Sequence, residues 1–117
     1  MSKLEEFGKV YIDDVRDRTI LLLENILKGQ VNAPRFKDLQ ENLNQLGVEE
    51  IELIKYITIS LIDNTLHNTL CLFEEYPEYE LISDGENIID LSDGLSAELY
   101  TDDGWIKKYS KYPSSFK

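Results

Sequence analysis

Apolar residues are densest between Ile51 and Ile62, where eight of the twelve positions carry a large apolar or aromatic side chain. On a helix these positions would cover most of the circumference, so the helix would need neighbours on several sides. We therefore predict one largely buried helix from Val48 to Glu75 at the centre of the domain. At about 1.5 Å per residue it would be about 42 Å long, and the Asn and Thr side chains between Asp63 and Asn68 predict a bend or break there.

Two further helices are predicted before this one. The first spans Ser2 to Lys28, because Ser2 and Glu5 match a capping box and Gly29 is suited to a helix end. Its predicted buried face consists of Leu4, Phe7, Tyr11, Val15, Leu22 and Ile26. Its predicted charged outer surface consists of Lys9, Asp13, Asp14, Arg16, Asp17 and Arg18. The second is short and amphipathic, begins near Pro34, ends at Gly47 and has an apolar face of Phe36, Leu39, Leu43 and Leu46.

The pattern changes after Pro77. Asp-Gly pairs occur at residues 84–85, 93–94 and 103–104, and Asp-Gly is a strong hairpin signal. Apolar residues roughly alternate between these pairs, which predicts three or four short strands between Tyr79 and Tyr109. The sequence thus predicts an α+β fold in one domain, residues 1–117, with three N-terminal helices including the long central one, followed by a small C-terminal antiparallel sheet and an irregular tail from Tyr109 to Lys117.

Composition narrows the cellular setting. The single cysteine, Cys71, cannot form an internal disulfide, and the N-terminus lacks the apolar core of a signal peptide. The most apolar segment is interrupted by Lys55, Ser60 and Asp63, so it falls short of the roughly 18 to 20 apolar residues that a membrane span requires. We expect a cytoplasmic protein with no membrane association.

The formal net charge of −11 is distributed unevenly. Between Lys55 and Lys107 lie 51 residues with twelve Asp and Glu and not one Lys or Arg, whereas the other 66 residues hold 11 acids and 12 bases. A field of one sign repels nucleic-acid phosphates and anionic lipids and attracts basic proteins. The sequence therefore predicts a basic protein partner and no nucleic acid.

Seven aromatic residues accompany these acids: Tyr76, Tyr79, Tyr100, Trp105, Tyr109, Tyr112 and Phe116. Tyr and Trp on such a surface are typical anchors of protein–protein contact, although the same residues would also shield the edges of a small sheet. The predicted partner-binding residues are Glu86, Asp90, Asp93, Glu98, Tyr100, Asp102, Asp103 and Trp105.

Asp63, His67 and Cys71 are four residues apart and would share one side of the central helix. A zinc site would need a further ligand, and the chain has no second His or Cys to provide it. We expect His67 to be structural, with a hydrogen bond to Asp63, and Cys71 to be a small buried residue. The turn aspartates lack the spacing of a calcium-binding EF-hand, and the common nucleotide and hydrolase motifs are missing, so no metal, cofactor or catalytic residue is predicted.

The segment from Leu91 to Pro113 contains Leu-Ser-Asp-Gly-Leu-Ser-Ala-Glu-Leu-Tyr, Asp-Asp-Gly-Trp-Ile and Tyr-Ser-Lys-Tyr-Pro. It resembles the C-terminal segment of small acidic bacterial proteins of unknown function, and the whole chain resembles the immunity proteins of bacterial toxin systems. That resemblance implies a non-enzymatic domain that binds and blocks a cognate toxin. Two alternatives stay open: a small metal-dependent hydrolase or other enzyme that uses Asp63 and His67, and an adaptor subunit of a larger complex.

Overall fold

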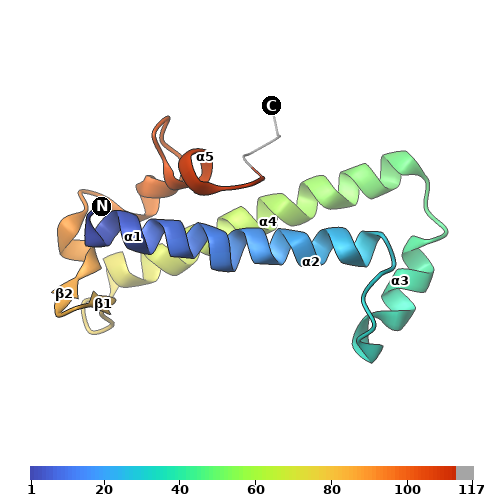
Figure 1. The fold of residues 1–117 in the computed structure, drawn as a ribbon, viewed down its shortest axis with the longest axis horizontal. Coiled ribbons are helices and arrows are strands. Elements are labelled where there is room, and N and C mark those ends of the chain that lie inside the picture. The colour runs from blue at the N-terminus through green and yellow to red at the C-terminus, as the bar shows by residue number, and fades with distance from the viewer. Residues whose placement is uncertain (113–117) are drawn as a thin grey trace.

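The long helix α4 has the bounds predicted from the sequence, Val48–Glu75. In this computed structural model, which describes residues 1–112, it runs antiparallel to the N-terminal helices (Figure 1). The predicted break between Asp63 and Asn68 does not occur. The hydroxyls of Thr65 and Thr69 donate to the carbonyls four residues earlier, so they follow the helix rather than compete with its backbone hydrogen bonds.

The N-terminal segment forms three consecutive helical stretches: α1 (Lys3–Val10), the π-helical turn η1 (Tyr11–Asp17) and α2 (Arg18–Leu27). The hydroxyl of Ser2 accepts a hydrogen bond from the Glu5 amide at 3.1 Å, which confirms the predicted N-cap. Gly29 follows the last turn with φ = 71°, a conformation that glycine adopts without strain.

The π turn changes which residues face the interior. The predicted face is correct as far as Tyr11, but beyond it Val15 and Leu22 are exposed, while Arg16 and Leu23 are buried. A π turn contains more residues than an α turn, so it moves the inward-facing set along by one residue. The predicted outer positions of Arg16 and Asp17 are therefore wrong.

One end of the molecule is formed by η2 (Pro34–Phe36) and α3 (Lys37–Leu43) (Figure 1). The side-chain amide of Gln40 holds the preceding loop, because it donates to the Val31 carbonyl and accepts from the Val31 amide, both at 2.9 Å. The predicted helix is shorter than expected, since α3 ends at Leu43 rather than at Gly47.

The other end contains the sheet, which has two strands, β1 (Ile82–Ser83) and β2 (Glu86–Asn87). They pair antiparallel, with Ile82 opposite Asn87 and Ser83 opposite Glu86. The turn residues Asp84 and Gly85 both have positive φ, 49° and 80°, as the predicted Asp-Gly hairpin requires. The predicted small antiparallel sheet is thus present with fewer strands.

The remaining predicted strands are helical. Residues after the hairpin form η3 (Ile88–Leu91), η4 (Leu95–Leu99) and the short helix α5 (Trp105–Tyr109). The other two Asp-Gly pairs precede η4 and α5 instead of closing hairpins. Position 104 requires glycine, because the backbone of Thr101 lies so close that a Cβ at this position would be 2.7 Å from the Thr101 carbonyl oxygen.

The main core lies where α1, η1, α4 and the C-terminal elements meet. Its buried residues are Tyr11, Ile12, Leu66, Leu70, Ile88, Leu95, Leu99, Trp105 and Ile106. A second, smaller cluster lies between the antiparallel helices α2 and α4 and consists of Ile20, Leu23 and Ile59. The large core therefore depends on the C-terminal elements, whereas the small one is formed mainly between α2 and α4.

The predicted burial of α4 is wrong for its N-terminal half. Within Ile51–Ile62 only Ile59 is buried, and Leu53 and Leu61 are 60% and 61% exposed. The molecule is too thin to surround this segment, as its longest axis is 49 Å and its shortest is 25 Å. Among residues 1–112, no helix combines the length and the apolar character needed to cross a membrane.

Candidate functional site

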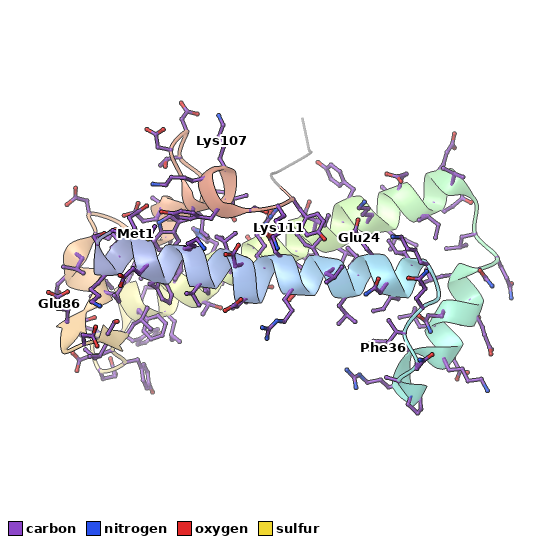
Figure 2. The ribbon with its side chains drawn as sticks, in the orientation of Figure 1. Met1, Glu24, Phe36, Glu86, Lys107 and Lys111 are labelled. Atoms are coloured by element: carbon purple, nitrogen blue, oxygen red, sulfur yellow. The ribbon has the colours of Figure 1, made fainter. Side chains whose placement is uncertain are left out.

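Most acids of the base-free segment lie on one end of the molecule. Figure 2 places Glu86 at this end and Phe36 at the opposite end. We call the following residues the acidic end: Glu74, Glu75, Glu78, Glu80, Glu86, Asp90, Asp93, Glu98, Asp102 and Asp103. They come from the C-terminus of α4, the hairpin, η3, η4 and the loop before α5, and all except the half-buried Glu98 are exposed.

The acidic end has little internal neutralisation. Of the twelve acids between Lys55 and Lys107, Asp63 pairs with Arg16 and Asp84 pairs with Lys3. The Lys3 contact lowers the pKa of Asp84, chiefly through the hydrogen bond. Within residues 1–112, the ten acids of the acidic end form no ion pair, so their charge faces the solvent.

A shallow hollow of about 370 Å³ brings two of these acids together. It is lined by Leu91, Ser92, Asp93, Gly94, Ala97, Glu98 and Thr101. The hydroxyl of Ser92 donates to Glu98 at 2.8 Å and accepts from the Gly94 amide at 3.1 Å, so the rim is held in place. Carboxylates beside such a hollow suit the ammonium or guanidinium group of a basic side chain.

Three tyrosines are exposed near the acidic end. Tyr76 and Tyr79 follow α4 and form an edge-to-face pair, with ring centroids 6.4 Å apart. Tyr100 is 54% exposed, and its hydroxyl donates to the Asp63 carbonyl at 2.9 Å. Burial of part of the phenol raises the pKa of Tyr100, and the Asp63 charge raises it further. Tyr109 and Tyr112 are half-buried, and Phe116 and Pro113 lie outside the described residues.

Trp105 is a core residue rather than a surface anchor. Its side chain is 0% exposed, and its Nε1 donates to Glu5 Oε2 at 3.2 Å. Glu5 Oε1 also accepts from Lys108 and from Tyr109, each at 2.6 Å. These hydrogen bonds, that of Lys108 first, lower the pKa of Glu5. Trp105 therefore stands apart from the other predicted partner-binding residues, because no partner can reach it in this structure.

The predicted pair of Asp63 and His67 does not form. Asp63 accepts from Arg16 instead, with 2.6 Å between Oδ1 and Nε. His67 Nε2 lies 3.5 Å from the Sγ of the half-buried Cys71, while His67 Nδ1 is buried with no hydrogen-bond partner among the described atoms. Over residues 1–112 we find no group of three or more His, Cys, Asp or Glu placed to hold a metal ion.

The ionic network around Arg16 was not predicted from the sequence. The guanidinium is fully buried, and besides Asp63 it donates to the Ser110 hydroxyl and the Tyr112 carbonyl, both at 2.7 Å. Asp17 accepts from Ser110 at 2.6 Å and from the Lys111 amide at 2.7 Å. The network therefore fastens the C-terminal segment to η1 and α4. The charged residues of the N-terminal helix did not indicate this network, because only the π turn directs Arg16 and Asp17 inward.

Comparison of the chain with protein-family models, curated proteins and solved structures found no match.

Proposed function

We propose that this protein is a non-enzymatic binding domain whose acidic end captures a basic protein. The observation that supports the proposal is the cluster of ten acids that form no ion pair with any of residues 1–112, and two of them, Asp93 and Glu98, lie beside one hollow. Mixed-sign surfaces avoid self-repulsion, so a surface of one sign that faces the solvent carries a cost in stability. Attraction of a basic partner offsets that cost and accelerates association.

The immunity-type role is the form of this proposal that we favour. A toxin that acts on nucleic acid needs a basic surface to bind phosphates, and an acidic domain complements that surface. The exposed tyrosines Tyr76, Tyr79 and Tyr100 would supply apolar contact beside the charges. The residues proposed to contact the partner are Glu86, Asp90, Asp93, Glu98, Tyr100, Asp102 and Asp103.

The enzymatic alternative has no supporting observation. It required Asp63 and His67 to act together, but the Asp63 carboxylate accepts two hydrogen bonds from Arg16 and none from His67. The binding role is therefore the function to test first.

The test uses an arginine-rich peptide as a probe of the acidic end and nuclear magnetic resonance to map the contact. We expect the largest chemical-shift changes at amides from Leu91 to Asp103, with affinity that falls as salt is added. Replacement of Asp93 and Glu98 by Lys should reduce the affinity at least tenfold, since two attractive charges become repulsive. The matched control replaces Glu49 and Glu52, exposed acids at the start of α4, and should change the affinity little.

A basic partner identified later extends the same test. Its association rate should fall with rising salt for the wild-type protein and less steeply for the variant with Lys at positions 93 and 98. An association rate that ignores salt, or a contact mapped to α1 and α2 alone, would contradict the proposal.

A further inference from the structure

A groove of about 390 Å³ lies between α1 and the hairpin, which are at the same end of the molecule (Figure 1). It is lined by Glu6, Phe7, Val10, Leu81, Ile82, Ser83 and Ile88. Five of these seven residues are apolar, and the volume is within the range of about 300–1,000 Å³ that is usual for ligand pockets. Val10 of α1 and Ile82 of β1 are 55% and 53% exposed, whereas Ile88 is fully buried. The groove therefore has an apolar floor and an exposed apolar residue on each of its two sides.

The groove follows the open edge of β1. Three consecutive residues, 81–83, line it, whereas a pocket on one face of a strand would be lined by alternate residues. The Leu81 carbonyl accepts from the Ile88 amide at 2.8 Å, and Ser83 lies opposite Glu86 beside the turn. Ile82 therefore lies between two hydrogen-bonded pairs, where the backbone N–H and C=O point away from the neighbouring strand. Among residues 1–112 these two groups have no hydrogen-bond partner, so β1 offers a donor and an acceptor beside the groove.

The charges around the groove are predominantly negative. Residues 1–10 and 78–90, which form it, contain seven Asp and Glu, and their side-chain bases are Lys3 and Lys9. Lys3 already contacts two carboxylates, one of them that of Asp84 in the hairpin turn, and Lys9 pairs with a third at 3.4 Å. Every charged side chain of these two ranges that forms no ion pair within residues 1–112 is an acid. The surroundings of the groove thus complement a basic segment.

Two carboxylates accompany the apolar residues of the groove, one from each side. Glu6 lines the groove from α1. On the hairpin, Asn87 lies opposite Ile82, so these two side chains share one face. The Asn87 amide donates to Glu80 at 3.3 Å, which holds the Glu80 carboxylate on that face. This arrangement suits a segment in which one apolar side chain is flanked by bases.

We infer that the groove receives an extended segment of the basic partner, which adds to β1 as a further strand. This inference rests on the proposed function, because the charge of the acidic end selects the partner. Backbone hydrogen bonds with Ile82 align the segment, one large apolar side chain fills the groove beside Phe7, and bases face Glu6 and Glu80. The groove thereby adds a requirement for an apolar residue within the basic sequence, and it adds contacts from α1.

The first test compares two acetylated peptides, Lys-Arg-Lys-Leu-Lys-Arg-Lys and the same sequence with Ser in place of Leu. Each is titrated into the isotope-labelled full chain and followed by nuclear magnetic resonance. We expect the leucine peptide to bind about tenfold more tightly, because the groove removes its apolar side chain from water. In addition to the changes at the acidic end, the leucine peptide alone should shift the amides of Phe7, Val10 and Ile82.

A variant of the protein tests the groove directly. Val10→Ser removes apolar contact from one side of the groove and should reduce the tenfold preference for the leucine peptide to about threefold or less. The matched control is Val48→Ser, because Val48 is also an exposed valine of a helix, 80% exposed at the start of α4, and it does not line the groove. The control should keep the full preference. Equal effects of the two substitutions would contradict the inference.

Strand addition is tested on the peptide, so that the fold of the protein is not disturbed. The leucine peptide is N-methylated at alternate residues, in two complementary sets. Only the N–H groups along one edge of an extended segment face β1. One set should therefore weaken binding about tenfold or more, and the other should have little effect. Equal effects of the two sets would contradict strand addition.

The outcomes separate this inference from the proposed function. If both peptides bind equally and shift only amides from Leu91 to Asp103, the groove is refuted as a binding site and the role of the acidic end stands. If the leucine peptide keeps its affinity for a chain with Lys at positions 93 and 98, the groove stands and the hollow beside Asp93 and Glu98 is refuted. Failure of both peptides to bind would refute the proposed function and this inference with it.

Sedimentation equilibrium of the full chain tests a different occupant. We expect no self-association that depends on the groove. A dimer of the wild-type protein that is lost with Val10→Ser and kept with Val48→Ser would assign the groove to a second copy of the chain and overturn the inference.

Discussion

The two halves of α4 differ in how the rest of the chain covers them. The C-terminal half packs against η4 and contributes Leu66 and Leu70 to the main core, which is closed by Trp105 and Ile106. The N-terminal half is richer in large apolar residues, yet it buries only Ile59 and exposes Leu53, Ile57 and Leu61. Figure 1 shows the reason, since the C-terminal elements gather at one end of the antiparallel pair formed by the N-terminal helices and α4.

Apolar content therefore does not identify the covered half of α4. The apolar residues from Ile51 to Ile62 indicate that this half of α4 needs neighbours, and within the described residues α2 and Tyr112 supply them around Ile59. What is left is an exposed face of α4 that includes Leu53, Ile57 and Leu61. Three pairs of substitutions test how far the two ends of the molecule differ.

The largest effect is expected for Trp105→Ala. The indole is completely buried in the covered half, and its loss should reduce the free energy of unfolding by about 3–5 kcal/mol through lost burial and the cavity left behind. Leu61→Ala, in the exposed half, should change it by no more than about 0.5 kcal/mol. Urea unfolding of both variants measures the difference. Equal losses would show that the halves are equally packed.

A moderate effect is expected for Gly8→Ala. Gly8 lies against the indole, and an added Cβ would be 2.6 Å from Trp105 Nε1, so the ring and α1 must move apart. Overpacking of this kind costs about 1–3 kcal/mol. The control is Gly29→Ala, where nothing lies within 4 Å and the change reports only the positive φ. Unchanged stability of Gly8→Ala would indicate that α1 packs loosely on α5.

The smallest effect is expected for Glu5→Gln, and it depends on pH. Hydrogen bonds from Lys108 and Tyr109 lower the pKa of Glu5, so the carboxylate stabilises the folded state above its ordinary pKa of 4.5, and this contribution is lost as the pH falls through the lowered value. The variant should be less stable than the wild type at pH 7, and the gap should narrow below pH 4.5. Urea midpoints measured from pH 7 to pH 3 test this, with Glu52→Gln as an exposed control. A gap that stays constant would contradict the assigned role of Glu5.

Part of the fold was predictable because some signals act locally. Ser2 as N-cap, Gly29 after α2 and Asp84-Gly85 in the hairpin each depend on a few neighbouring residues, and all three predictions are confirmed. The strands predicted at residues 89–91 and 95–99 do not form. In the second of them, Leu95 and Leu99 fit both an alternating strand and one turn of helix. The exposure of Ala97 and burial of both leucines show that helical spacing prevails.

The candidate site was predictable in its charge and less so in its geometry. The base-free segment from Tyr56 to Ile106 is a property of the sequence, and it predicted an exposed acidic surface to which residues such as Glu86 and Asp90 belong. The separation of Trp105 from that surface was not predictable, since its burial depends on Gly8 and Phe7, nearly 100 residues away.

The sequence alone determined the bounds of α4, the caps, the hairpin turn and the unequal distribution of charge, because each is set by residues close to one another along the chain. Only the tertiary structure decided which helix faces are covered. The π turn at Tyr11–Asp17 moves Arg16 and Asp17 inward, and their network with Asp63 and Ser110 fastens the C-terminal segment. At the end of the described residues, Tyr112 packs against the cluster of Ile20, Leu23 and Ile59. Burial depends on contacts between segments that are distant in the sequence, and in this protein those contacts are concentrated on the C-terminal half of α4.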